Sequence, residues 1–212
     1  MIFIGSRETG SPPHLRSDRF GKPRRMWDVS PTTSDPARHS DNVRVACCFL
    51  AADSVGLSRA PTGSTNSHGG AGEEIEPYHT NAISMLFNQG HETMEGGSER
   101  RRLDVVAQSM RAYLRFSVHG GVIAEHVRRL GCSARVQTDL EGDVLQPPLL
   151  TLAGLGEVSR IGDVILDPCL GPRRNSGAMR PGSNCPFQES ESSSRPSPRG
   201  PPRCGRDNRY AG

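Results

Sequence analysis

The sequence predicts a layered domain of helices and strands between two ends that cannot form a core. Apolar residues recur at helical spacing between residues 105 and 130, and a short apolar run at 82–87 has the length of a strand. The helical and strand-like stretches alternate along the chain, which indicates an α/β layered architecture. Only 33% of the residues are apolar and 5% aromatic, so the core must be confined to part of the chain.

The first helix is expected to begin at residue 36. Ser34 or Asp35 can act as the N-cap, and Pro36 suits the first helical position because its missing N–H has no partner there. The residues of its apolar face follow at steps of four, three and four: His39, Val43, Ala46 and Leu50. Strands are expected at 53–57 and 82–87, on either side of a polar loop at 59–76.

The longest helix is expected from residue 105 to residue 130. Its apolar stripe alternates steps of three and four through Tyr113, Phe116, Gly120, Ile123, Val127 and Leu130. Gly131 can end the helix at the C′ position, where glycine tolerates a left-handed backbone. Residues 133–138 then form the next expected strand.

The chain divides into three parts by composition. Residues 20–179 form the expected domain, and residues 1–19 form an expected disordered N-terminal segment. Residues 180–212 are rich in Ser, Arg and Pro, and their only large apolar side chains are Phe187 and Tyr210. Such a tail cannot offset its ordering entropy by burial, and we expect it to be disordered.

A glycine-bearing segment near residues 147–166 is the strongest candidate for a cofactor loop. Gly154, Gly156 and Gly162 would let the backbone turn tightly and approach a ligand. The dinucleotide fingerprint does not fit, because no strand of the expected kind precedes Gly154 and no helix follows Gly162. A simple turn between a helix and a strand is the alternative interpretation.

Three short motifs in this region resemble the corrinoid-binding region of reductive dehalogenases, and more distantly epoxyqueuosine reductase. They are Leu-Ala-Gly-Leu-Gly-Glu at 152–157, Ser-Arg-Ile-Gly at 159–162 and Gly-Pro-Arg at 171–173. Segments 26–31, 35–57, 90–95 and 108–113 also resemble this family in the same order, so the similarity covers residues 20–179. The resemblance implies an α+β, nitroreductase-like corrinoid-binding domain, here incomplete.

The resemblance also implies particular site residues. Cobalamin would be bound, through its nucleotide tail, by Gly154, Leu155, Gly156, Arg160 and Gly162. Tyr113 would donate a proton to the substrate carbon, helped by a cation that lowers the pKa of the phenol. Asn175 occupies the position of that basic partner and carries no charge, which leaves the adjacent Arg174 as a candidate. The alternative for Tyr113 is a core tyrosine with its hydroxyl at the edge.

The cysteines predict no metal site. Cysteines 47, 48, 132, 169, 185 and 204 form no Cys-x-x-Cys pair, which excludes an ordinary zinc or iron–sulfur site and implies no disulfide framework. The family carries an iron–sulfur module, whose ligands are absent here. We therefore expect a truncated or frame-disrupted member that needs a separate electron donor to act on a small organohalide. His119 and His126 lie two helical turns apart, too far for one metal.

The charge and hydropathy of the sequence limit the classes of function that we consider. A net charge of +3 without interleaved aromatics does not favour nucleic acid. No signal peptide and no run of 18 apolar residues is present, so we expect a cytoplasmic protein without a membrane span. Three hypotheses remain: a reductive dehalogenase-like oxidoreductase, a non-catalytic corrinoid-binding fragment, and an arginine-rich interaction protein, whose binding to nucleic acid would be salt-sensitive.

Overall fold

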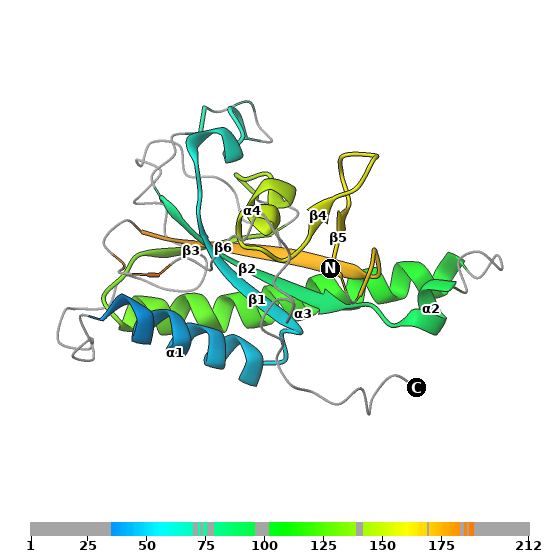
Figure 1. The fold of residues 1–212 in the computed structure, drawn as a ribbon, viewed down its shortest axis with the longest axis horizontal. Helices are drawn as coiled ribbons and strands as arrows, with labels where there is room; N and C mark the ends of the chain where they lie inside the picture. Colours follow the sequence, from blue (N-terminus) through cyan, green and yellow to red (C-terminus); the bar gives the residue numbers. More distant parts are fainter. Residues whose placement is uncertain are drawn as a thin grey trace.

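A four-stranded antiparallel sheet forms the centre of the computed structural model (Figure 1). The structure describes residues 35–69, 72, 74–75, 79–95, 102–138, 142–168, 170–182, 185 and 187–188. The strands lie in the order β1 (Ser54–Arg59), β2 (Asn81–Asn88), β6 (Arg174–Pro181) and β3 (Ala134–Gln137). The mixed helix and sheet architecture is therefore confirmed.

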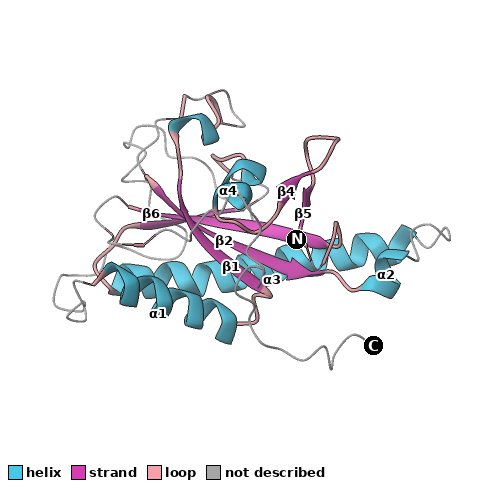
Figure 2. Cartoon of the chain, in the orientation of Figure 1, coloured by secondary structure: helices cyan, strands magenta, loops and turns pink. Residues whose placement is uncertain are grey.

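Two helices, α1 (Pro36–Phe49) and α3 (Arg102–Arg129), lie together on one face of the sheet (Figure 2). Helix α1 begins as predicted, because the Asp35 carboxylate accepts a hydrogen bond from the Ala37 N–H at 3.0 Å. The predicted stripe of α3 faces the sheet: Phe116, Ile123 and Val127 are at most 3% exposed, and Tyr113 is half-buried at its edge. No helix in the described part of the chain has the length and apolarity needed to cross a bilayer.

The opposite face of the sheet carries α4 (Gln146–Leu152) and the hairpin of β4 (Glu157–Val158) and β5 (Ile165–Leu166). Small side chains allow α4 to approach closely: a Cβ on Gly56 would lie 2.6 Å from the Ala153 carbonyl oxygen. A 3₁₀ turn (Thr62–Ser64) and the short helix α2 (His91–Glu95) complete the described elements.

Strand β6 crosses the boundary that we expected between residues 179 and 180. It pairs with β2 over 174–179 and with β3 over 178–181, and Met179 is fully buried. Beyond the strand, Cys185 is buried and Phe187 packs against the α1/α3 core, 5.7 Å from the His39 ring. The disorder expected for 1–19 and for 189–212 concerns residues outside the described ranges.

A disulfide joins Cys132 to Cys185, a pairing that the cysteine spacing did not imply. Cys132 follows α3 and Cys185 follows β6, and their Cα atoms lie 5.4 Å apart although 53 positions separate them. Closing a loop of that length is worth roughly 4 kcal/mol in the chain-entropy model. Cys48 is also disulfide-bonded, whereas the thiol of Cys47 is buried, and burial raises its pKa to about 12.

Helix α3 docks on the sheet through an aromatic ring laid over a glycine. Any Cβ on Gly177 would overlap the Phe116 ring, which also packs edge to face on Phe87 with centroids 6.3 Å apart. Gly120 faces the neighbouring strand, where a Cβ would lie 3.0 Å from Cγ1 of Val136. The absence of two side chains therefore sets the distance between α3 and the sheet.

We predict that Gly177→Ala destabilises the protein by about 3 kcal/mol, because the new methyl group has to displace the Phe116 ring. Urea unfolding followed by circular dichroism measures the effect. Gly63→Ala is the matched control, since a Cβ there meets nothing within 4 Å. Adding Phe116→Leu to Gly177→Ala should recover part of the loss. Equal midpoints for Gly177→Ala and the wild type would contradict this account of the docking.

Candidate functional site

The three glycines of the predicted loop each have a local structural reason. Gly154 ends α4 with a φ of 71°, and the following N–H of Leu155 donates to the Leu150 carbonyl at 3.0 Å. A Cβ on Gly156 would collide with β5, lying 2.8 Å from Cγ2 of Ile165. Gly162 turns the β4–β5 hairpin with a φ of 87° and has open space around it. Of the three, Gly162 therefore has the clearest room for a ligand.

Leu155 and Arg160 lie in opposite environments. Leu155 is fully buried in a cluster with Leu86 and Ile165, so its side chain anchors the hairpin to the sheet. Arg160 is exposed in the hairpin turn, next to Gly162. Of these two side chains, only that of Arg160 is accessible to a ligand from the solvent.

Arg174 is buried where β6 begins. Its side chain is 4% exposed and that of Asp167 is 1%, and Nη1 of Arg174 lies 3.8 Å from Oδ2 of Asp167. The same nitrogen donates to the Leu155 carbonyl at 3.2 Å. Burial lowers the pKa of Arg174 to about 10, while the Asp167 carboxylate opposes that shift. One backbone carbonyl and one carboxylate thus lie against this buried cation beneath the hairpin.

A pocket of about 220 Å³ opens beside this cation. Its wall is built from α4, the hairpin and β6: Pro147, Leu150, Asp163, Val164, Ile165, Pro172, Arg174, Asn175 and Ser176. Within the described structure, Nη2 of Arg174 is buried without a hydrogen-bond acceptor. A buried guanidinium N–H without a partner is costly, so this pocket favours a ligand that offers an acceptor oxygen.

Arg174 and Asn175 start β6 side by side, and successive side chains of a strand point to opposite faces. Arg174 pairs with Asn88 and reaches the α4 face, where it contacts Leu155. Asn175 pairs with Phe87, whose ring packs on α3, and its Oδ1 accepts from the Ser176 N–H at 2.8 Å. Arg174 therefore does not occupy the space of Asn175. The assignment of Asn175 and Tyr113 to one catalytic pair stays a prediction.

The fold matches solved structures over most of this chain. A reductive dehalogenase whose structure suggests a mechanism for B12-dependent dehalogenation is 38% identical with a TM-score of 0.68. The match covers 76% of this chain and 23% of that chain. The same values hold for the catabolic reductive dehalogenase NpRdhA, N-terminally tagged, alone and in complex with 3-bromo-4-hydroxybenzoic acid.

This chain is related to the reductive dehalogenases. It spans less than a quarter of the length of the solved reductive dehalogenases that it matches. No family model and no curated protein matches the chain.

Sequence reasoning missed two residues that shape the pocket of this reductive dehalogenase relative. Asp167 holds the turn before β6 by accepting from the Leu170 N–H at 2.9 Å, as well as facing Arg174. Gln146 accepts from the Ser176 hydroxyl at 2.7 Å, which fixes α4 to β6. An Asp-Pro pair followed by Gly-Pro marks a turn, but nothing local marks its carboxylate as buried.

The described residues contain no group of three or more His, Cys, Asp or Glu side chains placed to hold a metal ion. His119 lies against the Phe87 ring with centroids 5.6 Å apart, as a packing residue does. The prediction that this chain supplies no metal ligands stays a prediction.

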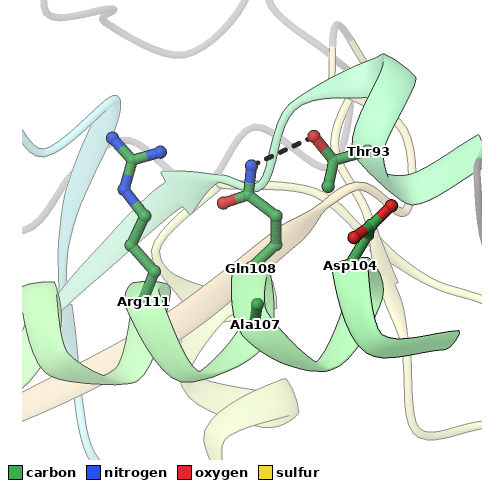
Figure 3. Close-up of a pocket in the computed structure, with 5 residues that line it drawn as sticks. All are labelled: Thr93, Asp104, Ala107, Gln108 and Arg111. Carbon is green, nitrogen blue, oxygen red and sulfur yellow. Dashed lines mark hydrogen bonds between the residues drawn. The ribbon is translucent and has the colours of Figure 1, made fainter. Parts of the chain in front are cut away.

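A second, open pocket of about 260 Å³ lies between α2 and α3 (Figure 3). Gln108 points across it and donates to the Thr93 hydroxyl at 3.2 Å, while Asp104 and Arg111 border it along α3. Its lining residues are exposed or half-buried, and none of them is a buried charge that needs a ligand. The pocket under the hairpin is therefore the better candidate site.

At the other end of β6, a buried histidine lies among arginines. His79 is 7% exposed, and its Nε2 lies 3.1 Å from the Ser133 hydroxyl. Arg180 donates to the His79 carbonyl and to the Thr65 hydroxyl, and Arg135 pairs with Asp143. Burial first, and then the charges of Arg180, Arg135 and Arg128, lower the pKa of His79 to about 4. The imidazole is therefore neutral in the folded protein at pH 7.

We predict that His79 makes the protein less stable in mild acid. Its pKa of about 4 when folded is below the ordinary 6.5, so stability present above pH 6.5 is lost as the pH falls toward 4. The full loss is about 3 kcal/mol. Urea midpoints between pH 7.5 and 4 measure it. His79→Gln should flatten that part of the profile, and exposed His68→Gln should not. Identical slopes for the two variants would refute the assignment.

Proposed function

We propose that this chain is a corrinoid-binding part of a reductive dehalogenase, with the corrinoid tail held beneath the β4–β5 hairpin. The observation that carries the proposal is the buried Arg174, which lines a pocket and whose Nη2 has no acceptor in the described structure, in a fold shared with a B12-dependent enzyme. The phosphate and amide oxygens of cobalamin are acceptors of the required kind. The residues present therefore fit the group.

The pocket matches a part of the corrinoid rather than the whole. Its volume of about 220 Å³ is below the roughly 300–1,000 Å³ of complete ligand pockets, so it suits one end of the molecule. We assign the tail phosphate to Arg160 and Arg174, one exposed in the turn and one buried below it. Gly162 leaves the turn open, while Gly154, Leu155 and Gly156 keep the hairpin in place.

In the catalytic version of the proposal, the chemistry that a bound corrinoid would supply is the two-electron reduction of a carbon–halogen bond. Replacing the halogen by hydrogen consumes two electrons and one proton and releases halide. Tyr113 would donate the proton from its phenol to the carbon. Asn175 would occupy the position of the basic partner that lowers the pKa of that phenol. Electrons would come from a separate iron–sulfur protein. An organohalide substrate is supported by the bromohydroxybenzoate bound to the related enzyme. We also propose that the protein is cytoplasmic and that nucleic acid is not among its partners.

A corrinoid-binding segment without catalysis is the second candidate, because the position of the basic partner holds the uncharged Asn175. It would bind cobalamin yet show no turnover with a chemical reductant. The arginine-rich interaction protein is less well supported, since arginines such as Arg115, Arg174 and Arg180 are engaged with the protein's own carbonyls.

We predict that the purified chain binds hydroxocobalamin and that Arg160→Ala and Arg174→Met each weaken binding about tenfold or more, the value of one charged hydrogen bond. Titration followed by visible absorbance measures the dissociation constants. Arg129→Met, on the outside of α3, is the matched control. Arg160 is exposed, so its variant tests the site even if Arg174→Met disturbs folding. A wild-type chain that does not bind cobalamin would refute the proposed function.

We further predict that Asn175→Lys raises dehalogenation measured with cobalamin and a strong chemical reductant, because a cation beside the phenol lowers the pKa of Tyr113. Adding Tyr113→Phe should abolish the gain. Halide release measures the rate, and a spectrophotometric titration of the phenol measures the pKa. Asn175→Gln is the uncharged control. If both rate and pKa stay unchanged in a folded, cobalamin-loaded protein, the two positions are not partners.

A further inference from the structure

Residues that follow β6 contact the amino-terminal part of α1. Phe187 packs against the His39 ring with centroids 5.7 Å apart. The backbone N–H of Gln188 donates to the Ser40 hydroxyl at 2.8 Å, and that hydroxyl donates to the Gln188 carbonyl at 3.0 Å. We call Cys185, Phe187 and Gln188 the clasp. The clasp covers His39 and Ser40 from the side of the chain that leaves the sheet.

The disulfide between Cys132 and Cys185 is the strongest attachment of the clasp. Its noncovalent contacts are weak by comparison. Phe187 is only half-buried and Gln188 is exposed, while the Asn81 amide reaches the Cys185 carbonyl at 3.4 Å, near the limit of a hydrogen bond. Fixing the backbone of one residue costs at least as much free energy as an ordinary hydrogen bond returns. The docked position of the clasp therefore depends on the disulfide.

The clasp covers a histidine that is poorly satisfied in its buried position. His39 is 2% exposed, and its Nδ1 is buried without a hydrogen-bond partner in the part of the chain that the structure describes. Burial first, and then the charge of His126 on α3, lower the pKa of His39. Water would satisfy this nitrogen. His39 therefore favours release of the clasp once the covalent link is broken.

The rest of the fold has its own attachments. Strand β6 pairs with β2 over 174–179 and with β3 over 178–181, and the Phe116 ring lies over Gly177. None of these contacts involves the clasp. The sheet and α3 can therefore stay assembled when the clasp leaves α1.

The proposed cytoplasmic location makes a disulfide unusual. Disulfides are rare in cytoplasmic proteins, and those that occur there are usually catalytic or redox-sensing. The proposed dehalogenation also draws electrons from a reduced protein. The expectation of a reducing environment rests on the proposed function, whereas the contacts of the clasp are independent of it.

We propose that the Cys132–Cys185 disulfide is a redox switch, which holds the clasp on α1 when oxidised and releases it when a dithiol reductant cleaves the bond. One thiolate of the reductant attacks a protein sulfur, which breaks the S–S bond and leaves a mixed disulfide, and its second thiolate then displaces the protein sulfur. The protein gains two electrons and two protons as two Cys thiols, and the dithiol becomes a disulfide. Both cysteines are at most 6% exposed, so the attack occurs when the clasp briefly opens.

The fluorescence of a single tryptophan in the clasp tests the switch without cobalamin. Trp27 is the only tryptophan of the chain, so Trp27→Phe combined with Phe187→Trp places one reporter against His39. Dithiothreitol should shift its emission to longer wavelength, because the released indole is in water. In the same background, Cys132→Ala with Cys185→Ala should show the shifted emission without reductant.

A matched control separates this disulfide from the other one. Cys48 is also disulfide-bonded, so dithiothreitol acts on its bond as well. Cys48→Ala in the reporter background should keep both the initial emission and the response to dithiothreitol. The variant without Cys132 and Cys185 should show no further response.

Histidine modification measures the release in the unaltered chain. After reduction and removal of the reductant, diethyl pyrocarbonate should modify His39 about tenfold faster or more, because the clasp no longer covers it. Exposed His68 should react equally in the oxidised and reduced protein. The buried thiol of Cys47 should stay unreactive toward a thiol reagent, because the core remains folded. Peptide mass spectrometry gives each rate.

Four outcomes overturn the inference. The first is a Cys132–Cys185 bond that dithiothreitol does not cleave in the folded protein. The second is an emission and a His39 modification rate that stay unchanged after the bond is cleaved. The third is reaction of Cys47 upon reduction, because the disulfide would then hold the whole fold together rather than the clasp. The fourth is a response to dithiothreitol that persists without Cys132 and Cys185.

Discussion

The contact between Phe116 and Gly177 is the constraint on which the rest of the structure depends. The ring of Phe116 occupies the space that a side chain on β6 would fill, so α3 can lie directly on the centre of the sheet. That position brings the end of α3 close to the end of β6, where Cys132 and Cys185 form their disulfide. It also leaves the other half of α3 facing outward with its apolar residues exposed. The missing Cβ at Gly177 is therefore linked to the core packing, to the position of the disulfide and to the side of α3 that is left exposed.

Helices were predictable because their signals are local. The Asp35-Pro36 start and the stripe through Phe116, Ile123 and Val127 depend only on neighbours in the chain, and both were confirmed. Strand β6 had no such signal. Its residues 174–181 contain no β-branched side chain, and they form a strand because β2 and β3 pair with them on both sides. The disulfide was equally hidden, since it depends on the packing of α3 rather than on cysteine spacing.

The candidate site also combines features with a local sequence signal and features that depend on the packing of distant segments. The glycines at 154 and 162 located two tight turns, because turns require glycine at particular backbone angles, but the sequence did not indicate the hairpin of β4 and β5. The chemical feature of the pocket, however, is a cation and a carboxylate buried together. Arg174 and Asp167 lie in sequence beside turn residues that are usually exposed, and only the hairpin folded over β6 removes them from water. Burial of a charge is a property of the assembled layers, so no local pattern could indicate it.

Strand β6 connects the two faces of the molecule through its alternation. Arg174 and Ser176 point toward α4 and the pocket, whereas Gly177 and Met179 point toward α3 and the core. Asn175 lies on the α3 side of the strand. It pairs with Phe87, whose ring packs against Phe116. A cation on that side would lie next to the Phe87 ring, which already stacks with Arg115 at 5.0 Å. A second positive charge would compete with Arg115 for the same aromatic face. Asn175→Lys therefore tests the packing under α3, where Arg115 also lies 3.8 Å from Asp53, as well as the predicted pairing of positions 175 and 113.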